Sequence, residues 1–363
     1  MNEALPWPVH GGQGAALRER FGLPADHPLI DFSANLNPLG PPAWVPARLA
    51  ALVAGLARYP APDYTRARAA IARREGVGIE QVRLTNGGAE AIFLAAALHA
   101  GTRAAIVEPS FAEYARACAA HGLAVSSISL TPPHFRLDPE RVAAQLEGCR
   151  VLFLCRPHNP TGTLVPREAI ERLLTLTEPL GCRVVIDEAF IDFVAANDER
   201  LTPLLSRFPH LLLLRSLTKC YTLPGLRLGY LLGEAETVRR VGAHQPPWSV
   251  NHLAAELVAP LLDDHDFMTR MHAWLVVEHP RLHGGLVGEG LRVVPSRANF
   301  FLVQPAEGAQ ATPGLFEGLL RHGVLARHTH NFAGLDGGWL RLALRDRADN
   351  DRLLAALAEA GGA

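Results

Sequence analysis

Short apolar runs alternate with amphipathic stretches along the first two thirds of the chain. The apolar runs cover residues 103–109, 123–130, 150–157, 183–190, 211–217 and 226–233. They are continuously apolar rather than alternating, which is typical of strands buried on both faces of a parallel sheet. Between them, helices are predicted over residues 88–100, 111–122, 166–181 and 201–208. The pattern predicts an α/β fold with a mostly parallel central sheet between helices.

The pattern changes after residue 245. A long helical stretch is followed by apolar segments at 290–304 and 338–345, and a further helix closes the chain. We therefore predict a large domain over 41–245, and a linking helix with a smaller α/β domain over 246–363. The first forty residues, which are rich in Gly and Pro, are expected to form an N-terminal arm that joins the small domain, with one short strand at LIDFSAN (29–35).

Composition narrows the class of partner. Hydrophobic residues make up 48% of the chain and the formal net charge is -1, without a basic tail for nucleic acid or a polybasic membrane anchor. No apolar run reaches about 18 residues, and the N-terminus does not resemble an export signal. The five cysteines form no C-x-x-C pair and are expected to be buried thiols in a reducing compartment. A cytoplasmic location follows, with no nucleic-acid or membrane partner.

A lysine follows the apolar run 211–217, in the segment SLTKCYTLPGLRLGY (216–230). A lysine after a strand is most often a solvated loop residue. Here Ser216, Thr218 and Arg227 flank Lys219, and two hydroxyls with one guanidinium suit a phosphate dianion. Burial and nearby positive charge lower the pKa of a lysine toward nucleophilic competence. Lys219 is therefore the candidate for a Schiff base with pyridoxal 5'-phosphate.

Polar side chains follow the two preceding apolar runs. Asp187 and Glu188 end the run in RVVIDEAFIDF; such a pair is commonly a helix cap or a solvated turn. As a functional group, Asp187 would face the pyridine nitrogen and keep it protonated, which preserves the ring as an electron sink, and Glu188 would be structural. Asn159, in RPHNPTGT (156–163), is an ordinary turn residue by type, but after a parallel strand it is placed to bond the ring hydroxyl.

Two further segments complete the predicted cofactor site. Gly88 and Ala89 open a helix in TNGGAEAIF (85–93) and would offer backbone N–H groups to a phosphate. A Gly-Gly pair before a helix is a weak signal alone, and the hydroxyls and arginine around Lys219 strengthen it. Phe111, in EPSFAEY (108–114), would stack on the cofactor ring, although an aromatic residue there is more often part of a core.

The order of these segments is that of the fold-type I aminotransferases. The chain resembles the histidinol-phosphate aminotransferase group nearly end to end, and within it the threonine-phosphate decarboxylases of cobalamin biosynthesis. The more specific matching segments are HGGQG (10–14), DFSANLNPLGPP (31–42), ARYPAPDY (57–64), DEAFIDF (187–193), SLTKCYTLPGLRLGY (216–230) and PPWSVN (246–251). The resemblance implies a pyridoxal-phosphate enzyme of this fold type.

The resemblance also implies roles that the patterns do not assign. Tyr59 is similar to the tyrosine that these enzymes send across a homodimer interface to the neighbour's cofactor phosphate. Arg341 matches the arginine that binds the substrate α-carboxylate, a task for which a planar fork is suited. The substrate phosphate would be bound by residues of the arm and the small domain, namely His10, Ser33, Asn35, Arg327 and His328.

At one position the sequence differs from the histidinol-phosphate aminotransferases, and this position bears on whether the reaction is a transamination or a decarboxylation. Histidinol-phosphate aminotransferases carry Tyr after Asp-Glu-Ala, where this chain has Phe190. The departure favours decarboxylation of a small phosphorylated amino acid, threonine phosphate or serine phosphate. An aminotransferase acting on histidinol phosphate shares every cofactor residue and is the main alternative. A non-catalytic ligand sensor would need a DNA-binding module, for which the first eighty residues leave no room.

Overall fold

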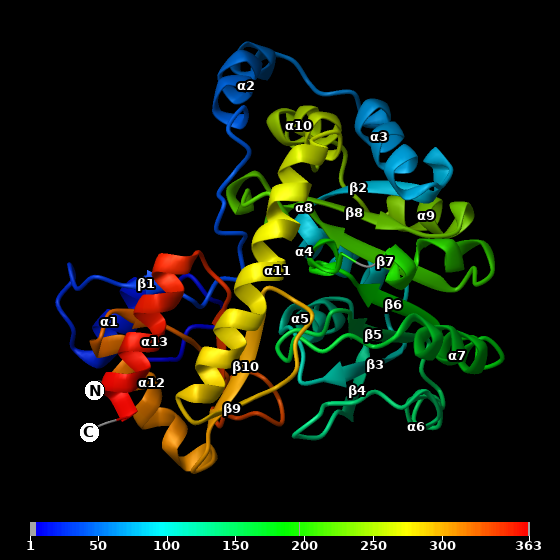
Figure 1. The fold of residues 1–363 in the computed structure, drawn as a ribbon. Coiled ribbons are helices and arrows are strands. Elements are labelled where there is room, and N and C mark those ends of the chain that lie inside the picture. The colour runs from blue at the N-terminus through cyan, green and yellow to red at the C-terminus, as the bar shows by residue number, and fades with distance from the viewer. Residues whose placement is uncertain (1–4, 196, 362–363) are drawn as a thin grey trace.

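A central sheet of seven strands forms the larger part of the molecule (Figure 1). The computed structural model describes residues 5–195 and 197–361. The strand order is β2 (Val82–Asn86), β8 (Leu228–Leu232), β7 (Leu211–Ser216), β6 (Arg183–Asp187), β5 (Val151–Cys155), β3 (Arg103–Glu108) and β4 (Ala124–Ser129). β8 runs antiparallel to β2 and β7, and the other neighbouring pairs are parallel. The predicted α/β class and mostly parallel sheet are confirmed.

Helices bury both faces of this sheet, as the continuously apolar strands predict. The helices of this unit are α3 (Thr65–Glu75), α4 (Gly87–Ala97), α5 (Glu113–Ala120), α6 (Pro139–Ala143), α7 (Arg167–Thr177), α8 (Leu217–Cys220), α9 (Ala235–Gly242) and α10 (His252–Leu262). Ile106 and Phe153 pack in a cluster with α4, α5 and α9. Their neighbours Val107 and Leu152 belong to the main core, with residues of α3, α7 and α10. Successive strand residues point to opposite faces, so both sets are apolar.

Two elements of this unit differ from the expectation. β2 is not among the predicted strands, because its sequence VRLTN mixes polar and apolar residues at the edge of the sheet. The helix expected over 201–208 is a 3-10 helix over Thr202–Ser206. Pro203 at its start and Pro209 shortly after its end leave room for only a short helical segment.

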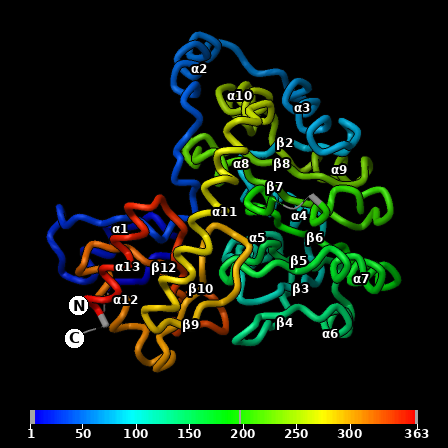
Figure 2. Tube along the Cα trace, in the orientation of Figure 1, coloured from blue at the N-terminus to red at the C-terminus, as the bar shows by residue number. Residues whose placement is uncertain are grey.

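A second sheet of four antiparallel strands forms the smaller part. Its order is β12 (Arg327–His328), β13 (Leu340–Ala343), β10 (Phe300–Pro305) and β9 (Leu291–Val293), accompanied by α12 (Thr312–Arg321) and α13 (Arg347–Gly361). The N-terminal segment, with α1 (Gly14–Phe21) and β1 (Ile30–Asp31), joins this part through the parallel pairing of β1 with β11 (Val324–Leu325). Both ends of the described chain lie there (Figure 2).

The long helix α11 (His265–Gly288) runs from the α10 end of the large sheet to β9 of the small sheet (Figure 1). α2 (Val45–Leu52) lies at the far end of the large part, against α10. The division of the chain at residues 40 and 245 stays a prediction. The five cysteines are buried and unpaired, as expected. None of the described helices is both long and apolar enough to cross a membrane.

Candidate active site

The carboxyl ends of three adjacent parallel strands bring the main predicted cofactor residues together. Asn159 follows β5, Asp187 ends β6, and Lys219 lies in α8 directly after β7. β6 pairs with both β5 and β7, so these ends share one edge of the sheet, where ligands of such sheets bind. All three side chains line a cavity of about 480 Å³, which we call the active-site cavity.

Most of the other predicted residues line the same cavity. They are Ala89, Phe111 and Arg227 from the cofactor set, and His10, Ser33, Asn35, Arg327 and Arg341 from the substrate set. Gly88, Ser216 and Thr218 lie just outside its wall: a Cβ atom on Gly88 would be 3.9 Å from Cβ of Ser216, whose hydroxyl is 2.7 Å from that of Thr218. Tyr59 and His328 lie elsewhere.

Lys219 has the environment of a nucleophilic amine. Burial lowers the pKa of Lys219 to about 8, with Arg341 and Arg227 adding to the effect and Asp187 opposing it. A neutral amine is therefore available near pH 8, far below the ordinary range of lysine. Lys219 is also the only lysine of the chain; all the other residues with a permanently positive side chain are arginines. Because a Schiff base with the cofactor needs a lysine, the sequence leaves Lys219 as the single candidate for it.

Asp187 is held by a partner that the sequence analysis did not assign. The hydroxyl of Tyr114 donates to Oδ2 of Asp187 at 2.8 Å, and the Ala189 backbone N–H donates to Oδ1 at 3.0 Å. Burial raises the pKa of Asp187, which makes its carboxylate a stronger acceptor for a proton on a ligand nitrogen. Tyr114 lies one helical turn beyond Phe111 in the same EPSFAEY segment, and this spacing was the available signal.

Four groups that can donate hydrogen bonds to a phosphate lie beside Lys219. Gly87 begins α4 with a φ of 79°, and a Cβ atom there would come within 2.6 Å of Nη2 of Arg227. The N-cap residue, Asn86, makes no side-chain hydrogen bond to the helix, so the first-turn N–H groups of α4 are left for another acceptor. With the hydroxyls of Ser216 and Thr218, these donors suit a phosphate dianion. Together with Asp187, Asn159 and Phe111, they fit pyridoxal phosphate.

A buried ionic cluster lies behind these strand ends. Glu188 pairs through Oε1 with Arg156 at 3.1 Å and through Oε2 with Arg215 at 2.8 Å. Arg156 follows β5 and Arg215 lies in β7, and all three side chains are buried. Glu188 therefore ties together the three strands that carry Asn159, Asp187 and Lys219, in keeping with the structural role expected for it.

Two arginines face the cavity from the small sheet. Arg327 of β12 and Arg341 of β13 are direct cross-strand partners, and both are buried. Burial lowers the pKa of Arg341 to about 9, with a contribution from Arg327, and lowers that of Arg327 to about 10. Like charges opposite each other are unfavourable. The arrangement therefore suits a ligand that brings two anionic groups.

Arg341 also connects the two sheets. Its Nη1 donates to Oδ1 of Asn159 at 2.5 Å and its Nη2 to the Ser33 carbonyl at 2.8 Å. Its Nε is buried and has no hydrogen-bond partner among the described residues. Nε and Nη2 share one edge of the guanidinium, which is the edge that binds a carboxylate with two hydrogen bonds.

The remaining candidates for the substrate phosphate have different surroundings. His10 lies 3.2 Å from a carboxylate oxygen of Glu113, and Ser33 donates to Oδ1 of Asp31 at 2.6 Å. Oδ1 of Asn35 is buried without a partner in the described chain. His328 does not line the active-site cavity: its Nε2 is 2.8 Å from Nη1 of Arg327 and 2.9 Å from the Pro8 carbonyl. This placement gives His328 contact with Arg327, not direct access to a ligand in that cavity.

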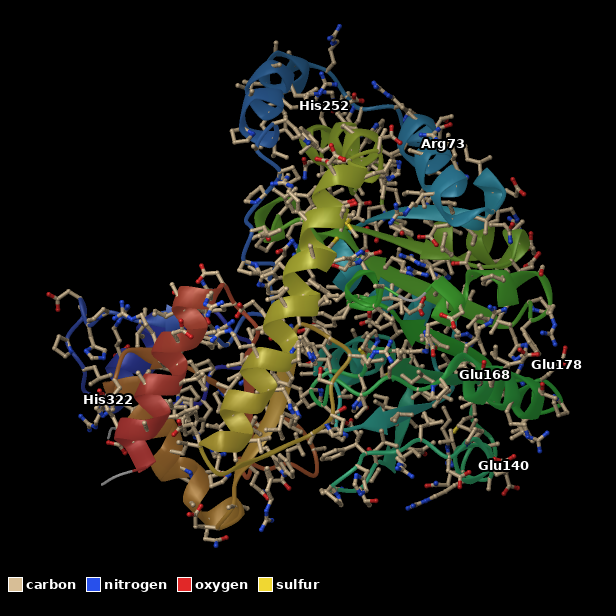
Figure 3. All side chains as sticks on the ribbon, in the orientation of Figure 1. Arg73, Glu140, Glu168, Glu178, His252 and His322 are labelled. Carbon is tan, nitrogen blue, oxygen red and sulfur yellow. The ribbon has the colours of Figure 1, made fainter. Side chains whose placement is uncertain are left out.

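Tyr59 lies away from the cavity on the outer surface. It is 81% exposed and packs against Trp248, with ring centroids 4.7 Å apart. The 3-10 helix before it, Val53–Ala57, lies beside α10 near His252, which is labelled in Figure 3. Val53 and Leu56 of this helix are also exposed. A single chain therefore leaves Tyr59 in contact with solvent.

Comparisons with known proteins agree with this architecture. Threonine-phosphate decarboxylase of Salmonella typhimurium is 38% identical over 352 residues, which is 96% of this chain and 95% of that protein. Histidinol-phosphate aminotransferase of Methanothermobacter thermautotrophicus is 31% identical over 99% of this chain and 95% of its own. The crystal structure of histidinol-phosphate aminotransferase from Clostridium acetobutylicum superposes with a TM-score of 0.86, at 28% identity, over 92% of this chain and 99% of that one.

A family model also matches most of the chain. It describes the aminotransferases of class I and II and covers residues 27–357. The matched range spans both sheets, the strand ends with Asn159, Asp187 and Lys219, and the two small-sheet arginines. The resemblance drawn from the sequence is confirmed, and this chain belongs to the class I and II aminotransferase family.

Proposed function

We propose that this protein is a pyridoxal-phosphate enzyme that decarboxylates L-threonine O-3-phosphate to (R)-1-amino-2-propanol O-2-phosphate and CO₂, a reaction of cobalamin biosynthesis. The observation that carries the proposal is the pair of buried, directly opposed arginines, Arg327 and Arg341, in the cavity of Lys219. Threonine phosphate has a carboxylate and a phosphate on adjacent carbons. Histidinol phosphate has a phosphate but no carboxylate and would leave one arginine without an anion, so in an aminotransferase only the dicarboxylate 2-oxoglutarate would occupy both arginines.

Bound pyridoxal phosphate supplies an electron sink for the bond that breaks at Cα of the amino acid. Lys219 would hold the cofactor covalently, and the α4 N-terminus, Ser216, Thr218 and Arg227 would bind its phosphate. Asp187, whose pKa burial raises, would keep a proton on the pyridine nitrogen, and Tyr114 fixes the orientation of this carboxylate. Asn159 would bond the ring oxygen, and Phe111 would stack on the ring.

The substrate would be held by its two anionic groups. The Nε edge of Arg341 has an unused donor for the carboxylate, and Arg327 would bind the phosphate with help from His10, Ser33 and Asn35. His328 would act through its contact with Arg327. Two fixed anion sites orient the amino acid relative to the ring and so determine which bond of Cα is broken.

One side chain, Phe190, favours loss of CO₂ over transamination. Phe190 lines the cavity and packs edge-on against Phe300 at 5.0 Å between centroids, so this wall has no hydroxyl for the ring oxygen. After CO₂ leaves, Cα needs a proton. The substrate amine would take the place of Lys219 on the cofactor, which would leave Lys219 as a free amine in the cavity. With a pKa of about 8 this amine is mostly protonated at pH 7, so Lys219 would donate that proton.

The proposal includes a homodimer in the cytoplasm, with Tyr59 reaching the cofactor phosphate of the neighbouring chain. The exposure of Tyr59 beside Trp248, Val53 and Leu56 supports an interface there. It also retains the division into an arm over 1–40, a large domain over 41–245, and a linking helix with a small domain over 246–363.

The test is to assay the purified, cofactor-loaded protein with L-threonine phosphate. We expect CO₂ and aminopropanol phosphate, without any requirement for a keto acid. Turnover of histidinol phosphate with 2-oxoglutarate, without CO₂ from threonine phosphate, would instead establish the aminotransferase. Comparing serine phosphate with threonine phosphate in the same assay measures how much the substrate methyl group contributes to binding, which we expect to be about 1–3 kcal/mol.

A further inference from the structure

A second cavity of about 480 Å³ lies in the small part of the molecule, outside the active site. Aromatic side chains form much of its wall: Trp7 has Phe316 at 5.5 Å, Phe21 at 5.8 Å and His328 at 4.6 Å between ring centroids. His330 stacks on Trp7 at 4.2 Å. This volume and lining are typical of small-molecule sites rather than of packing defects.

Arg20 places an unbalanced charge in this cavity. Its side chain is only 7% exposed and lines the cavity, with the guanidinium carbon 4.4 Å from the centroid of the Trp7 ring. Its Nε is buried without a hydrogen-bond partner, and within residues 5–195 and 197–361 no carboxylate forms an ion pair with it. A buried N–H donor without an acceptor is unfavourable, and an anionic ligand in the cavity would supply that acceptor.

Other groups around the cavity agree with an anion. α12 begins there with Thr312, Pro313 and Gly314, and its first turn has neither a side-chain cap nor an acidic residue. His328 has a second buried ring nitrogen, Nδ1, without a partner in the described chain. Glu317 also lines the cavity, but Arg321 pairs with it at 2.6 Å. The glutamate makes a ligand with a single anionic group more favourable than a polyanion.

We propose that this cavity is a second ligand site, which binds a planar aromatic carboxylate. The carboxylate would pair with Arg20, for which two parallel hydrogen bonds are the natural geometry. The flat apolar body would lie among Trp7, Phe21 and Phe316, where its burial stabilises the complex. The ligand therefore differs in chemistry from the proposed substrate, which is aliphatic and carries two anionic groups.

The second cavity shares two segments with the active-site cavity. Trp7 lines the second cavity, while Val9 and His10 line the active-site cavity; likewise His328 lines the former and Arg327 the latter. Nη2 of Arg327 donates to the Val9 carbonyl, and Nε2 of His328 lies 2.9 Å from the Pro8 carbonyl. A ligand that fixes Trp7 therefore also acts on Arg327. This coupling rests on the proposed function, whereas the binding itself does not.

The experiment is calorimetric titration of the full-length, cofactor-loaded protein with 2-naphthoate. We expect saturable binding of about one molecule per chain, weakened about tenfold or more in Arg20→Met because the charge-assisted pair is lost. Arg352→Met, which removes an exposed arginine of α13, should bind as the parent does. The uncharged analogue 2-naphthalenemethanol should bind parent and Arg20→Met equally. Absence of saturable 2-naphthoate binding, or equal affinity in Arg20→Met, would overturn the proposal.

Two further variants locate the ligand. Trp7→Leu should weaken 2-naphthoate, whereas Arg341→Gln, in the active-site cavity, should not. Loss of affinity in Arg341→Gln with none in Arg20→Met would place the ligand in the active-site cavity and reject a second site. Arg20→Met is expected to fold with an unchanged or raised melting temperature, because it removes a buried charge that has no carboxylate partner. The titration needs no turnover, so failure of the decarboxylase assignment leaves its outcome readable.

Discussion

At the cofactor end of the active-site cavity, the functional side chains follow adjacent strands and have partners from the chain itself. Asp187 accepts hydrogen bonds from Tyr114 and the Ala189 backbone, and Glu188 ties β5, β6 and β7 together behind it. At the substrate end, two buried arginines oppose each other, and Nε of Arg341 has no partner in the described chain. At the first end Asp187 has its hydrogen-bond partners before a substrate binds, whereas at the second end the two guanidinium groups still lack the anions of the substrate.

The two ends differ in this way because one holds the cofactor and the other binds and releases the substrate. Groups that orient a cofactor held through many turnovers, such as Asp187, gain from rigid strands and from hydrogen bonds within the protein. Groups that bind and release a substrate must leave donors unused, and the protein bears that cost while the site is empty. Variants at the two ends should therefore fail differently, by losing the cofactor or by losing substrate affinity.

The largest effect is expected from Lys219→Ala, at the cofactor end. Loss of the only lysine should lower turnover by about 10⁴-fold or more, because the covalent link and the proton donor disappear together. Absorbance spectra should show that the visible band of the bound cofactor is lost. Borohydride treatment of the parent should fix the cofactor to the peptide that contains Lys219, as mass spectrometry can check. Parent-like turnover in the variant would contradict the assignment.

The two arginines test the substrate end. Arg341→Gln and Arg327→Gln should each lower kcat/KM for threonine phosphate by about 100- to 1,000-fold, because each leaves a substrate anion in a buried site without its counter-charge. Cofactor absorbance should remain that of the parent. Release of the cofactor by either variant would show that these arginines also hold the cofactor, and the two ends would then not be separate in function. Arg352→Gln, on exposed α13, is the matched control and should leave kcat/KM unchanged.

The cost of holding Lys219 in the cavity should be visible in the cofactor-free chain. Its pKa is about 8 in the folded chain against an ordinary value of 10.5, so between these values the unfolded chain binds more protons. Stability therefore rises as the pH increases from 8 to 10.5, and the cost is fully present below pH 8. Lys219→Met should be more stable than the parent by about 2–3 kcal/mol at pH 7.

Denaturant unfolding of both cofactor-free proteins at a series of pH values measures this difference. It should shrink steadily above pH 8 and approach zero above pH 10.5. A difference that does not depend on pH would mean that packing, and not the charge of the lysine, is responsible. The result sharpens the comparison, because it shows what the cofactor end costs before its ligand is bound.

The two ends were also unequally predictable from sequence. Lys219, Asp187 and Asn159 each follow an apolar run, and the ends of parallel strands meet at one edge, so local patterns were enough to bring them together. The substrate end combines the arm with two short strands of the small sheet, far apart in sequence. Arg341 and Arg327 were proposed there only through the family resemblance, and nothing in their local sequence indicates that they are cross-strand partners.

The expectations for His328 and for β2 differ from the structure because they, too, depend on neighbours in space that are far apart in sequence. His328 follows Arg327 directly in a strand, and alternate strand residues point to opposite faces. One of two such neighbours therefore faces the active-site cavity, and the other faces the second cavity. β2 was not predicted because its sequence, VRLTN, mixes polar and apolar residues and lacks the continuous apolar character of the inner strands. Such facts depend on which element lies beside which, and a linear pattern does not contain that information.

The smallest effect is expected from Tyr114→Phe, which removes one hydrogen bond to Asp187 and keeps the stacked ring beside Phe153. The Ala189 N–H still orients the carboxylate, so kcat should fall by only about tenfold. KM for threonine phosphate should stay constant, because the arginines are untouched. Without the tyrosine hydroxyl, burial should raise the pKa of Asp187 further, so the acid limb of the kcat profile should move to higher pH. An increase in KM without a change in kcat would place Tyr114 at the substrate end and remove the separation between the two.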